Sequence, residues 1–386
     1  MRWTAVRSGA LLLGLMSCGG TRNETTPGAQ GAGQATPSTA GETHVRPPEG
    51  GGAADAGGAP GAGPGSGSPT CARDPLTTCP GTMSGRWCVE TFPAEGQFEP
   101  QGVWSDRPDN AWAVGWRFLT GGDREAVLMH WSGCVWSEVA NPDTARFQYA
   151  RGVWGVGPND LWIVGDGFVV LHFDGQSLTP VPVPVTGGQV AADIASASGS
   201  ASNDVWASGF LPLHWDGTSW TAVSIPTNNP NQYFADIWAN AANDVWTVGD
   251  QAAAHFDGSS WTVDEIVTGP MGISNFLYTV WSSGAEAWAA GPGNRIHHFQ
   301  NGQWTLTTTP TDSGPLLYDL GGMNGDVHLV GSQSTLRILE NDTTFAPVTD
   351  APAEGGVYQG VWVSQAQVWA VGLTTGNEAL VIRRAR

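Results

Sequence analysis

From about residue 100 onward, the chain alternates short apolar stretches with polar turns. The stretch Gly152–Gly165 reads Gly-Val-Trp-Gly-Val-Gly-Pro-Asn-Asp-Leu-Trp-Ile-Val-Gly, and Asp236–Gly249 repeats its pattern. Further copies begin near Gly102, Asp193, Thr279, Asp319 and Gly360. A self-similar unit of roughly 40–50 residues built from short strands is typical of β-propeller blades. We therefore expect an all-β protein made of repeated blades.

Each unit contains four predicted strands, called a to d here. Strand a carries an aliphatic residue followed by tryptophan, as in Val153-Trp154, and strand b ends in a glycine such as Gly165. That glycine indicates either an unusual backbone angle or close packing. Strand c ends in histidine and an aromatic residue, as in His255-Phe256, before an Asp-Gly turn typical of hairpins. Strand d then carries a tryptophan such as Trp261.

The two ends of the repeat complete each other. The last unit, 360–384, supplies strands a to c, whereas segment 84–91 matches the strand-d pattern of Gly258–Val263. We predict a seven-bladed β-propeller of four-stranded blades, closed by pairing of 84–91 with 360–384. Closure of this kind removes the exposed sheet edges that an open array would leave.

The N-terminal region predicts export. Arg2 and Arg7 precede a short apolar run that is typical of a signal peptide over 1–17 and too short to span a membrane. The sequence Leu15-Met16-Ser17-Cys18 resembles the lipobox of bacterial lipoproteins, which implies cleavage before Cys18 and lipid attachment to it. Cleavage without lipid is the alternative. We expect a lipid-anchored protein of the cell envelope, held in the outer membrane.

Residues 18–70 form a second region, rich in Gly, Ala, Pro and Ser and without aromatic residues after the cysteine. Such a composition cannot bury enough apolar surface to fold, so a disordered linker is expected. The propeller domain is then 71–386.

The repeats resemble the tryptophan-rich propeller repeats of bacterial secreted proteins and lipoproteins. Two motifs carry the resemblance: Asn-Asp-Val-Trp-x-Val-Gly at Asn243–Gly249 and His-Trp-Asp-Gly-x-x-Trp at His214–Trp220. The resemblance covers 84–386. The Asp-box repeats of sialidases and the WD-repeats are more distantly similar, but Asp and Gly are adjacent here and the Gly-His pair of WD-repeats is absent. Propellers include lyases, glycosidases and interaction platforms, so the resemblance implies no particular ligand.

Charge and cysteine content narrow the picture. A formal net charge of −19 repels phosphate backbones, so we expect no nucleic-acid partner. In an exported protein, four cysteines after the lipobox predict two disulfides, although a zinc site is the alternative. Three connectivities are possible, and we expect a bond across the ring closure and a second in the entry loop. The expected pairs are Cys88–Cys134 and Cys71–Cys79.

The repeated polar residues have a structural interpretation and a functional one. The strand-c histidines occur once per blade and cannot converge on one metal ion, so we expect them to be structural and expect no metal or cofactor. Three aspartates that open strand a, Asp193, Asp236 and Asp319, either cap the strand or bind a cation. The strand-c histidines are His130, His172, His214, His255 and His298.

The tyrosines supply the best candidate for a binding site. All five precede strand a, on the face where the predicted strand-b-to-c loops surround the mouth of the central channel. Trp116, Arg117 and Arg151 are predicted on the same face. We hypothesise an aromatic rim that stacks on sugar rings; the alternative is that each tyrosine packs over its own crossover. The five tyrosines are Tyr149, Tyr233, Tyr278, Tyr318 and Tyr358.

These observations favour a non-catalytic binding or scaffold module, exposed to the periplasm or the cell surface. The expected ligand is a glycan or an envelope protein at the channel mouth, and the expected state is a monomer. A propeller hydrolase or lyase acting on polysaccharide, and an envelope assembly factor, are the alternatives. We find no Ser-His-Asp or metal-ligand spacing that predicts catalysis.

Overall fold

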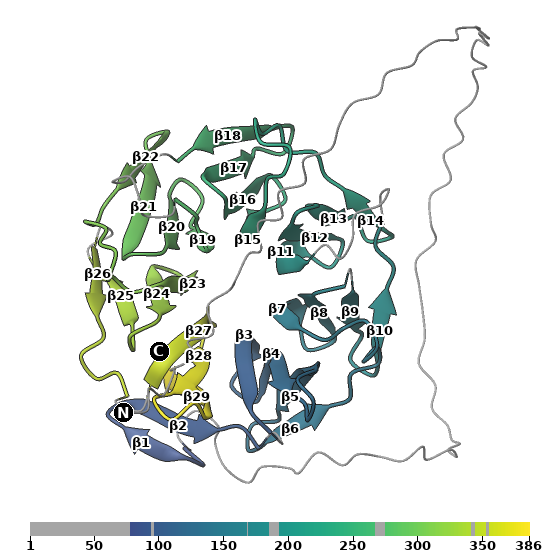
Figure 1. Ribbon diagram of the computed structural model, residues 1–386, viewed down its shortest axis with the longest axis vertical. Helices are drawn as coiled ribbons and strands as arrows, with labels where there is room; N and C mark the ends of the chain where they lie inside the picture. Colours follow the sequence, from purple (N-terminus) through teal and green to yellow (C-terminus); the bar gives the residue numbers. More distant parts are fainter. Residues whose placement is uncertain are drawn as a thin grey trace, which may run out of the picture. The chain divides into compact units, whose positions relative to one another are not determined.

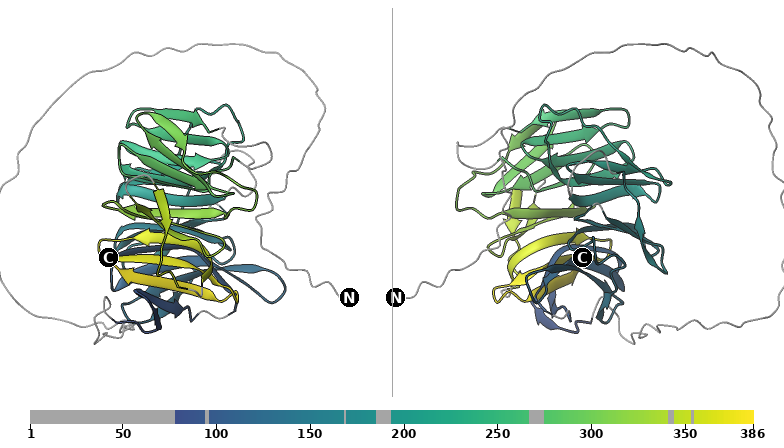
Figure 2. Two further views of the ribbon diagram at one scale, coloured as in Figure 1. Left: turned by 90° about the vertical axis from the view of Figure 1, so that its left-hand side faces the viewer. Right: turned by 45° about the vertical axis from the view of Figure 1, so that its right-hand side comes forward.

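The computed structural model describes residues 78–93, 96–167, 169–184, 193–266, 275–340, 344–352 and 355–386. The predicted signal peptide, Cys18, the predicted linker and Cys71 lie outside these residues. Strands β1 to β29 form seven antiparallel sheets arranged around a central channel (Figure 1). Side views show the strands of successive blades stacked around the ring (Figure 2). Within the described part of the chain, no helix is long and apolar enough to cross a membrane. The predicted seven-bladed fold is confirmed.

Blades 1 to 6 each contain four consecutive strands, and the first strand of each lies innermost (Figure 1). Blade 1 comprises β3 (Phe98–Arg107), β4 (Asn110–Phe118), β5 (Arg124–Trp131) and β6 (Trp136–Val139). Blade 2 comprises β7 (Ala150–Gly157), β8 (Asp160–Gly165), β9 (Val170–Phe173) and β10 (Leu178–Val181). Blade 3 comprises β11 (Ile194–Ala201), β12 (Asp204–Gly209), β13 (Leu213–Trp215) and β14 (Trp220–Ala222).

The remaining consecutive blades follow the same order. Blade 4 comprises β15 (Phe234–Ala241), β16 (Asp244–Gly249), β17 (Ala252–Phe256) and β18 (Trp261–Glu265). Blade 5 comprises β19 (Thr279–Ser282), β20 (Ala287–Gly291), β21 (Arg295–Gln300) and β22 (Gln303–Leu306). Blade 6 comprises β23 (Leu317–Met323), β24 (Asp326–Gly331), β25 (Leu336–Glu340) and β26 (Thr344–Pro347).

Blade 7 joins the two ends of the domain, as predicted. Its inner strands are β27 (Gly355–Val363), β28 (Gln367–Thr374) and β29 (Ala379–Ala385), and the N-terminal β2 (Trp87–Thr91) is its fourth strand. Strand β2 pairs antiparallel with β29, with Cys88 opposite Arg383. Strand β1 (Thr82–Ser84) adds a fifth, outermost strand that the repeat pattern did not predict.

The disulfide at this closure differs from our prediction. Cys79 is bonded to Cys88, with Cα atoms 5.4 Å apart, so neither expected pair forms. Cys134 is also disulfide-bonded. The reason is local: Cys79 lies three residues before the start of β1, which folds back on β2 as a hairpin. The disulfide therefore links β2, the strand that closes the ring, to the segment that leads into it and not to blade 1.

Tryptophans on the second strand of the blades hold neighbouring blades together. Trp162 of blade 2 contacts Trp215 of blade 3 with ring centroids 5.0 Å apart. The same contact crosses the closure, where the Trp369 ring of blade 7 lies 6.2 Å from that of Trp131 in blade 1. Offset and edge-to-face aromatic pairs of this kind add to the free energy of area burial. The same packing rule therefore holds on both sides of the closure, whereas β24 of blade 6 carries His328 at the tryptophan position.

The strand-c histidines are structural in the described blades. In blade 4, His255 stacks on Trp246 with ring centroids 4.0 Å apart, and its Nε2 lies 2.8 Å from Asp244 Oδ1. The same carboxylate accepts a bond from Trp246 Nε1 at 2.9 Å. Each histidine thus links an Asn, Asp or Glu at the start of strand b to a buried ring. The equivalent pairs are His130–Asn110, His172–Asp160, His214–Asp204 and His298–Glu286.

Tryptophans of the innermost strands fill the centre of the ring. Trp362 of blade 7 reaches across it, with ring centroids 6.5 Å from Trp104 of blade 1 and 6.2 Å from Trp238 of blade 4. Trp362 Nε1 also donates to the Ser105 carbonyl of β3 at 2.7 Å. Glycines make room for the rings, since a Cβ on Gly199 would lie 2.7 Å from Trp154. These tryptophans therefore form an aromatic floor across the central channel.

Above this floor, polar side chains tie neighbouring inner strands together in blades 4 to 7. Asp236 accepts bonds from its own neighbour, Ile237 N, and from Val280 N of blade 5, each at 2.8 Å. Asp319 likewise accepts from Val361 N of blade 7 at 2.8 Å, and Leu320 N donates to Thr279 Oγ1 at 2.9 Å. We call Asp236, Thr279 and Asp319 the polar belt.

The polar belt supports the capping interpretation of two aspartates and corrects the third. Asp236 and Asp319 satisfy backbone N–H groups, as a strand cap should. Asp193 does not occupy the matching position, because the pairing of Ser198 with Trp206 aligns Ser196 with Asp236. The weak repeat in blade 3, which lacks the strand-a tryptophan, led to the wrong alignment.

Replacement of the central tryptophan should destabilise the whole ring. Trp362→Ala removes packing shared with blades 1 and 4, and we expect the free energy of unfolding to fall by about 3–5 kcal/mol in urea denaturation. Val135→Ala, at a side chain that is 49% exposed, is the control and should change the value by less than about 0.5 kcal/mol. A similar small effect at both positions would contradict a central packing role for Trp362.

The polar belt should make stability depend on pH. Burial raises the pKa of Asp319, and the charge of Asp236 raises it further. The folded state then holds this proton more tightly than the unfolded state, so stability from Asp319 is lost as pH rises above about 4. Relative to Asp319→Asn, the wild-type free energy of unfolding should therefore decrease with rising pH, measured by urea denaturation at several pH values.

Asp257 is a control for which stability should change with pH in the opposite direction. Hydrogen bonds from Ser259 and Ser260 lower the pKa of this exposed aspartate to about 2. The wild-type free energy of unfolding relative to Asp257→Asn should thus increase between pH 2 and about 4. If the free energy of unfolding relative to each variant changed in the same direction with pH, the polar belt would not be the source of the pH dependence.

Candidate functional site

The inner strands begin at the mouth of the central channel. The loops that join the second and third strands of each blade, the b–c loops, lie on the same face. The glycine that ends strand b allows the chain to approach closely there. A Cβ on Gly165 would lie 1.8 Å from the Tyr149 carbonyl oxygen, and one on Gly249 would lie 1.9 Å from that of Tyr233. Close packing, rather than a positive φ angle, explains these two glycines. We call this face the channel-mouth face.

Position along the start of the inner strand decides where each tyrosine points. The residue that pairs with the glycine faces the core: Phe234, opposite Gly249, is only 2% exposed. Tyr149 and Tyr233 come one residue earlier and are half-buried. Tyr318 comes one residue after the paired position, at a register shift between Leu317 and Asp319, where a β-bulge can re-aim a side chain.

Tyr358 does not belong with the other four tyrosines. It pairs directly with Gly372, at the position equivalent to Phe234, and is fully buried in the core of blade 7. The sequence spacing before the tryptophan is nearly the same for all five, but a one-residue change of register turns the side chain inward. The structure therefore brings Tyr149, Tyr233, Tyr278 and Tyr318 to the mouth and leaves Tyr358 in the core.

Aromatic rings form a continuous series over blades 3 to 6. The Tyr233 ring lies between Phe210 and Phe276, with centroids 4.8 Å and 6.0 Å away. Phe276 contacts Tyr278 at 5.4 Å, and Tyr278 stacks on Tyr318 at 5.9 Å. Phe210 is 42% exposed, and the tyrosines are half-buried. The rings thus present edges and faces to the mouth while supporting one another.

The series continues in blades 1 and 2 with cations added. Trp116 contacts Tyr149 with ring centroids 5.1 Å apart. The Arg124 guanidinium lies 4.8 Å from the Phe118 ring and 4.9 Å from the Tyr149 ring, as in cation–π contacts. Arg151 lies 5.9 Å from the Tyr149 ring. We call the series from Phe118 to Tyr318 the aromatic arc.

Arg151 joins the two parts of the arc through an ion cluster. It pairs with Asp166 and, at 3.4 Å, with Asp193. Burial and the neighbouring Asp166 raise the pKa of Asp193, and burial raises the pKa of Tyr233 to about 12. Burial alone would lower the pKa of Arg151, but its bond to Asp166 raises it, so the guanidinium stays charged.

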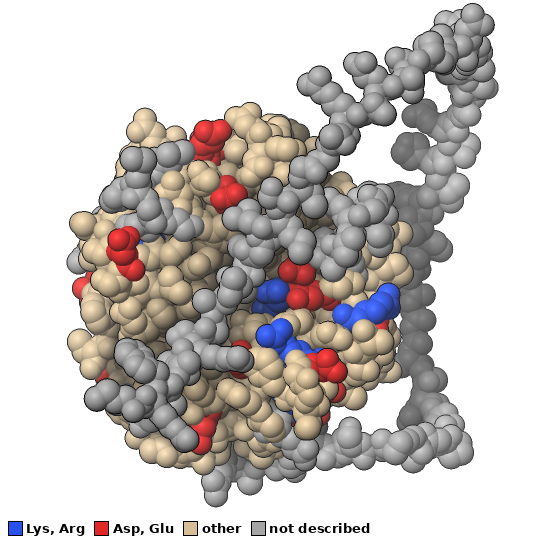
Figure 3. All heavy atoms as spheres, viewed as in Figure 1, with Lys and Arg blue, Asp and Glu red and all other residues tan. Residues whose placement is uncertain are grey.

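Arg117, predicted on the same face, is held by two carboxylates. Its guanidinium is held by Glu125 at 2.8 Å and Glu138 at 2.9 Å, and its side chain is only 16% exposed. These bonds tie the b–c hairpin of blade 1 to its outer strand. Figure 3 shows arginine side chains gathered over blades 1 and 2, with carboxylates beside them, whereas blades 4 and 5 carry only isolated charges on the visible face.

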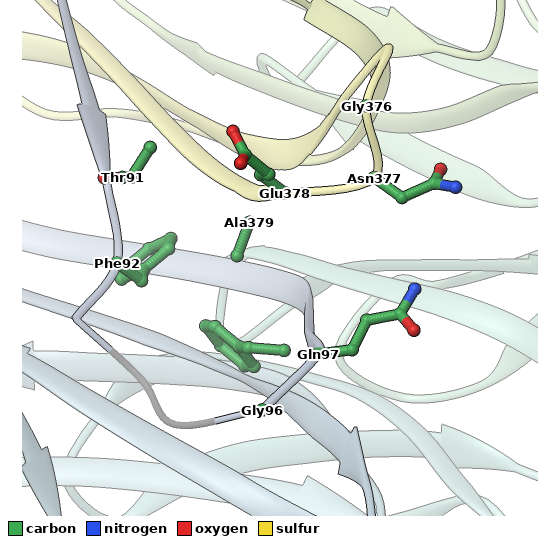
Figure 4. Close-up of a pocket in the computed structure, with 9 residues that line it drawn as sticks. Thr91, Phe92, Gly96, Gln97, Gly376, Asn377, Glu378 and Ala379 are labelled. Carbon is green, nitrogen blue, oxygen red and sulfur yellow. The ribbon is translucent and has the colours of Figure 1, made fainter.

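A shallow groove lies beside the arc, between blades 7 and 1. It has a volume of about 690 Å³ and is bounded by the β28–β29 turn and the segment that leads into β3 (Figure 4). The side chains of Gln97 and Asn377 extend to the same side of the groove from its two walls. A Cβ on Gly96 would lie 3.9 Å from the Phe118 carbonyl oxygen, so the groove adjoins the arc.

Sequence reasoning missed several members of the arc. Phe210 directly follows the glycine that ends strand b in blade 3, and Phe276 precedes Tyr278 by two residues. Both positions could have been found by aligning the blades on that glycine rather than on tryptophan. Arg124 and Phe118 face each other across β4 and β5, a pairing that needed the register of the hairpin. Within the described residues, no group of three or more His, Cys, Asp or Glu side chains could hold a metal ion.

Comparisons with known proteins identify the fold alone. No family model matches the chain, and no curated protein matches its sequence. Among solved structures, "YCF48 bound to D1 peptide" superposes with a TM-score of 0.59 at 15% identity, covering 80% of this chain and 100% of that one.

Two other solved structures show how widely the fold is shared. The extracellular domain of the putative one component system BT4673 from B. thetaiotaomicron has a TM-score of 0.58 at 13% identity, covering 78% of this chain and 40% of that one. The WD40 β-propeller domain of Doa1 has a TM-score of 0.55 at 12% identity, covering 76% and 95%. The chain is thus a seven-bladed β-propeller similar to both WD40 and YCF48 propellers, a fold that commonly serves as a binding or scaffold module.

Proposed function

We propose that the protein is an exported, lipid-anchored binding module of the cell envelope whose ligand docks on the channel-mouth face. One observation carries the proposal: the aromatic arc, in which two runs of touching rings and guanidinium groups, Phe118 to Arg151 and Phe210 to Tyr318, lie on either side of the Arg151 ion cluster. Rings with exposed faces bind flat, partly apolar ligands through stacking and area burial. Below the mouth, tryptophans fill the centre of the ring, so the ligand stays at the mouth.

Two ligand classes fit this face. A glycan is favoured first, because sugar rings present flat C–H faces to aromatic rings and hydroxyl groups to neighbouring amides. A polypeptide is the second, since the similar propeller YCF48 was solved bound to D1 peptide. The net charge of −19 supports the absence of a nucleic-acid partner. We propose that the protein acts as a monomer.

The ion cluster argues against the hydrolase or lyase alternative. A raised pKa at Asp193 is what a general acid requires, and Asp166 lies nearby. Arg151 pairs with both carboxylates, however, and holds them in one cluster rather than as a separate acid and base. We therefore propose binding without catalysis at this face.

A binding screen of the full chain against a glycan array and envelope polysaccharides tests the proposed site. Phe118→Ala and Phe210→Ala remove exposed rings, at 39% and 42% exposure, and together should weaken binding at least about tenfold with little loss of stability. Tyr358→Phe changes a buried tyrosine and should leave binding unchanged. If only the Tyr358 variant lost affinity, the mouth would not be the site; binding of no glycan would favour a protein partner, sought by cross-linking in the envelope.

The proposed anchor has its own test. Cells fed a labelled fatty acid should incorporate label into the wild-type chain but not into Cys18→Ser, because the lipid would be joined to that thiol. Ser17→Thr, which keeps a small residue before the cysteine, serves as the matched control. Equal labelling of the wild type and the Cys18 variant would place the lipid at another residue, and no labelling of either would show that the chain carries no lipid.

A further inference from the structure

Arg124 differs from the other arginines of the channel-mouth face. Arg117, Arg146 and Arg151 each form an ion pair with a carboxylate. Among the described residues, no carboxylate oxygen lies within ion-pair distance of Arg124, and its buried Nε has no hydrogen-bond partner. A guanidinium carries five N–H donors and no acceptor, so its hydrogen-bonding capacity is unused here. The Phe118 and Tyr149 rings nevertheless hold it in place.

A stacked but unpaired guanidinium is suited to bind a carboxylate. Its planar fork matches the two oxygens of that group, and stacking on aromatic rings fixes the plane of the fork before a ligand arrives. Preorganisation lowers the entropy that binding would otherwise cost. Glu99 interacts electrostatically with Arg124 without pairing with it, and burial raises the pKa of Glu99. The cation therefore remains available to an external anion.

The surroundings of Arg124 favour a sugar as the carrier of that carboxylate. Phe118, whose side chain is 39% exposed, offers a ring face next to the guanidinium. Next to Phe118, the groove at Gly96 is lined by Thr91, Gln97 and Asn377. Amides and hydroxyls donate and accept at once, which suits sugar hydroxyl groups.

We infer that the blade-1 edge of the mouth binds a glycan containing uronic-acid sugars, with a sugar carboxylate on Arg124, one ring on Phe118 and a neighbouring unit in the groove. This inference rests on the proposed function and specifies the ligand class of the same face. The pairing is local, because charges further away than about 8 Å are screened at physiological salt, so the overall negative charge does not forbid it.

Isothermal titration calorimetry on the full chain tests the inference with two matched probes. Oligogalacturonate carries free carboxylates, and its methyl ester has the same backbone without the charge. At physiological ionic strength the ester should bind about 10–100-fold more weakly, as expected for loss of a charge-assisted bond. Equal affinity for the two probes, or no binding of oligogalacturonate and oligomannuronate by the wild type, would overturn the inference.

Variants of Arg124 locate the carboxylate. Arg124→Gln should bind oligogalacturonate about 10–100-fold more weakly than the wild type and should bind the ester with unchanged affinity. Arg124→Lys keeps the positive charge and should retain part of the affinity for oligogalacturonate. Arg146→Gln removes the same charge from the same face, at a side chain that is 65% exposed and paired with Asp143, and should have no effect. Near-UV circular dichroism confirms that each variant is folded.

The outcomes separate this inference from the proposed function. If Arg124→Gln bound oligogalacturonate like the wild type while the Phe118 and Phe210 variants lost binding, the mouth would remain the site and the carboxylate contact would be wrong. If a hexaglutamate peptide bound with the same dependence on Arg124 and no uronate did, the ligand would be an acidic peptide and the inference would fall. If the Phe118 and Phe210 variants kept full affinity, the proposed function itself would fail.

Discussion

The pairing of β2 with β29 is the constraint on which the rest of the structure depends. Without it, blade 7 would lack its fourth strand, and the two ends of the domain would no longer share a sheet. The closure also places buried Arg383 against Glu90 at 3.1 Å and above the Trp131 and Trp369 rings, so charge and aromatic packing meet at one seam. Every inter-blade contact, including those that position the aromatic arc, requires the ring geometry that this pairing imposes.

Most of the fold could be predicted because each blade repeats the same local chemistry. The Asn-Asp turn, the glycine that ends strand b and the Asp-Gly turn each mark a boundary that local backbone physics requires. The errors arose where the repeat is weakest. Blade 3 lacks its inner tryptophan, so Asp193 was aligned with Asp236, and β1 lies outside the repeat altogether. The disulfide partner of Cys88 depended on this unpredicted hairpin.

The candidate site was less predictable, because it depends on single-residue register. Tyr233 lies five residues before Trp238, whereas Tyr358 lies four residues before Trp362, and this single residue places one at the mouth and the other in the core. Both strands have the same register shift, after Phe234 in blade 4 and after Tyr358 in blade 7, so the exact spacing decides which way the ring points. The partners of Arg117 and Arg151 also come from other strands. The sequence pattern predicted the channel-mouth face, but not that Arg124 is the arginine on it without an ion pair.

The tryptophan floor has a consequence for the geometry of any long ligand. A polymer cannot pass through a ring whose centre is filled by Trp362 and its neighbours, so it must lie across the mouth and leave by the same face. Such a surface can engage an internal stretch of a chain as readily as its end, and it can release that stretch sideways without unthreading it. A module of this kind could hold a cross-linked network, in which free chain ends are scarce.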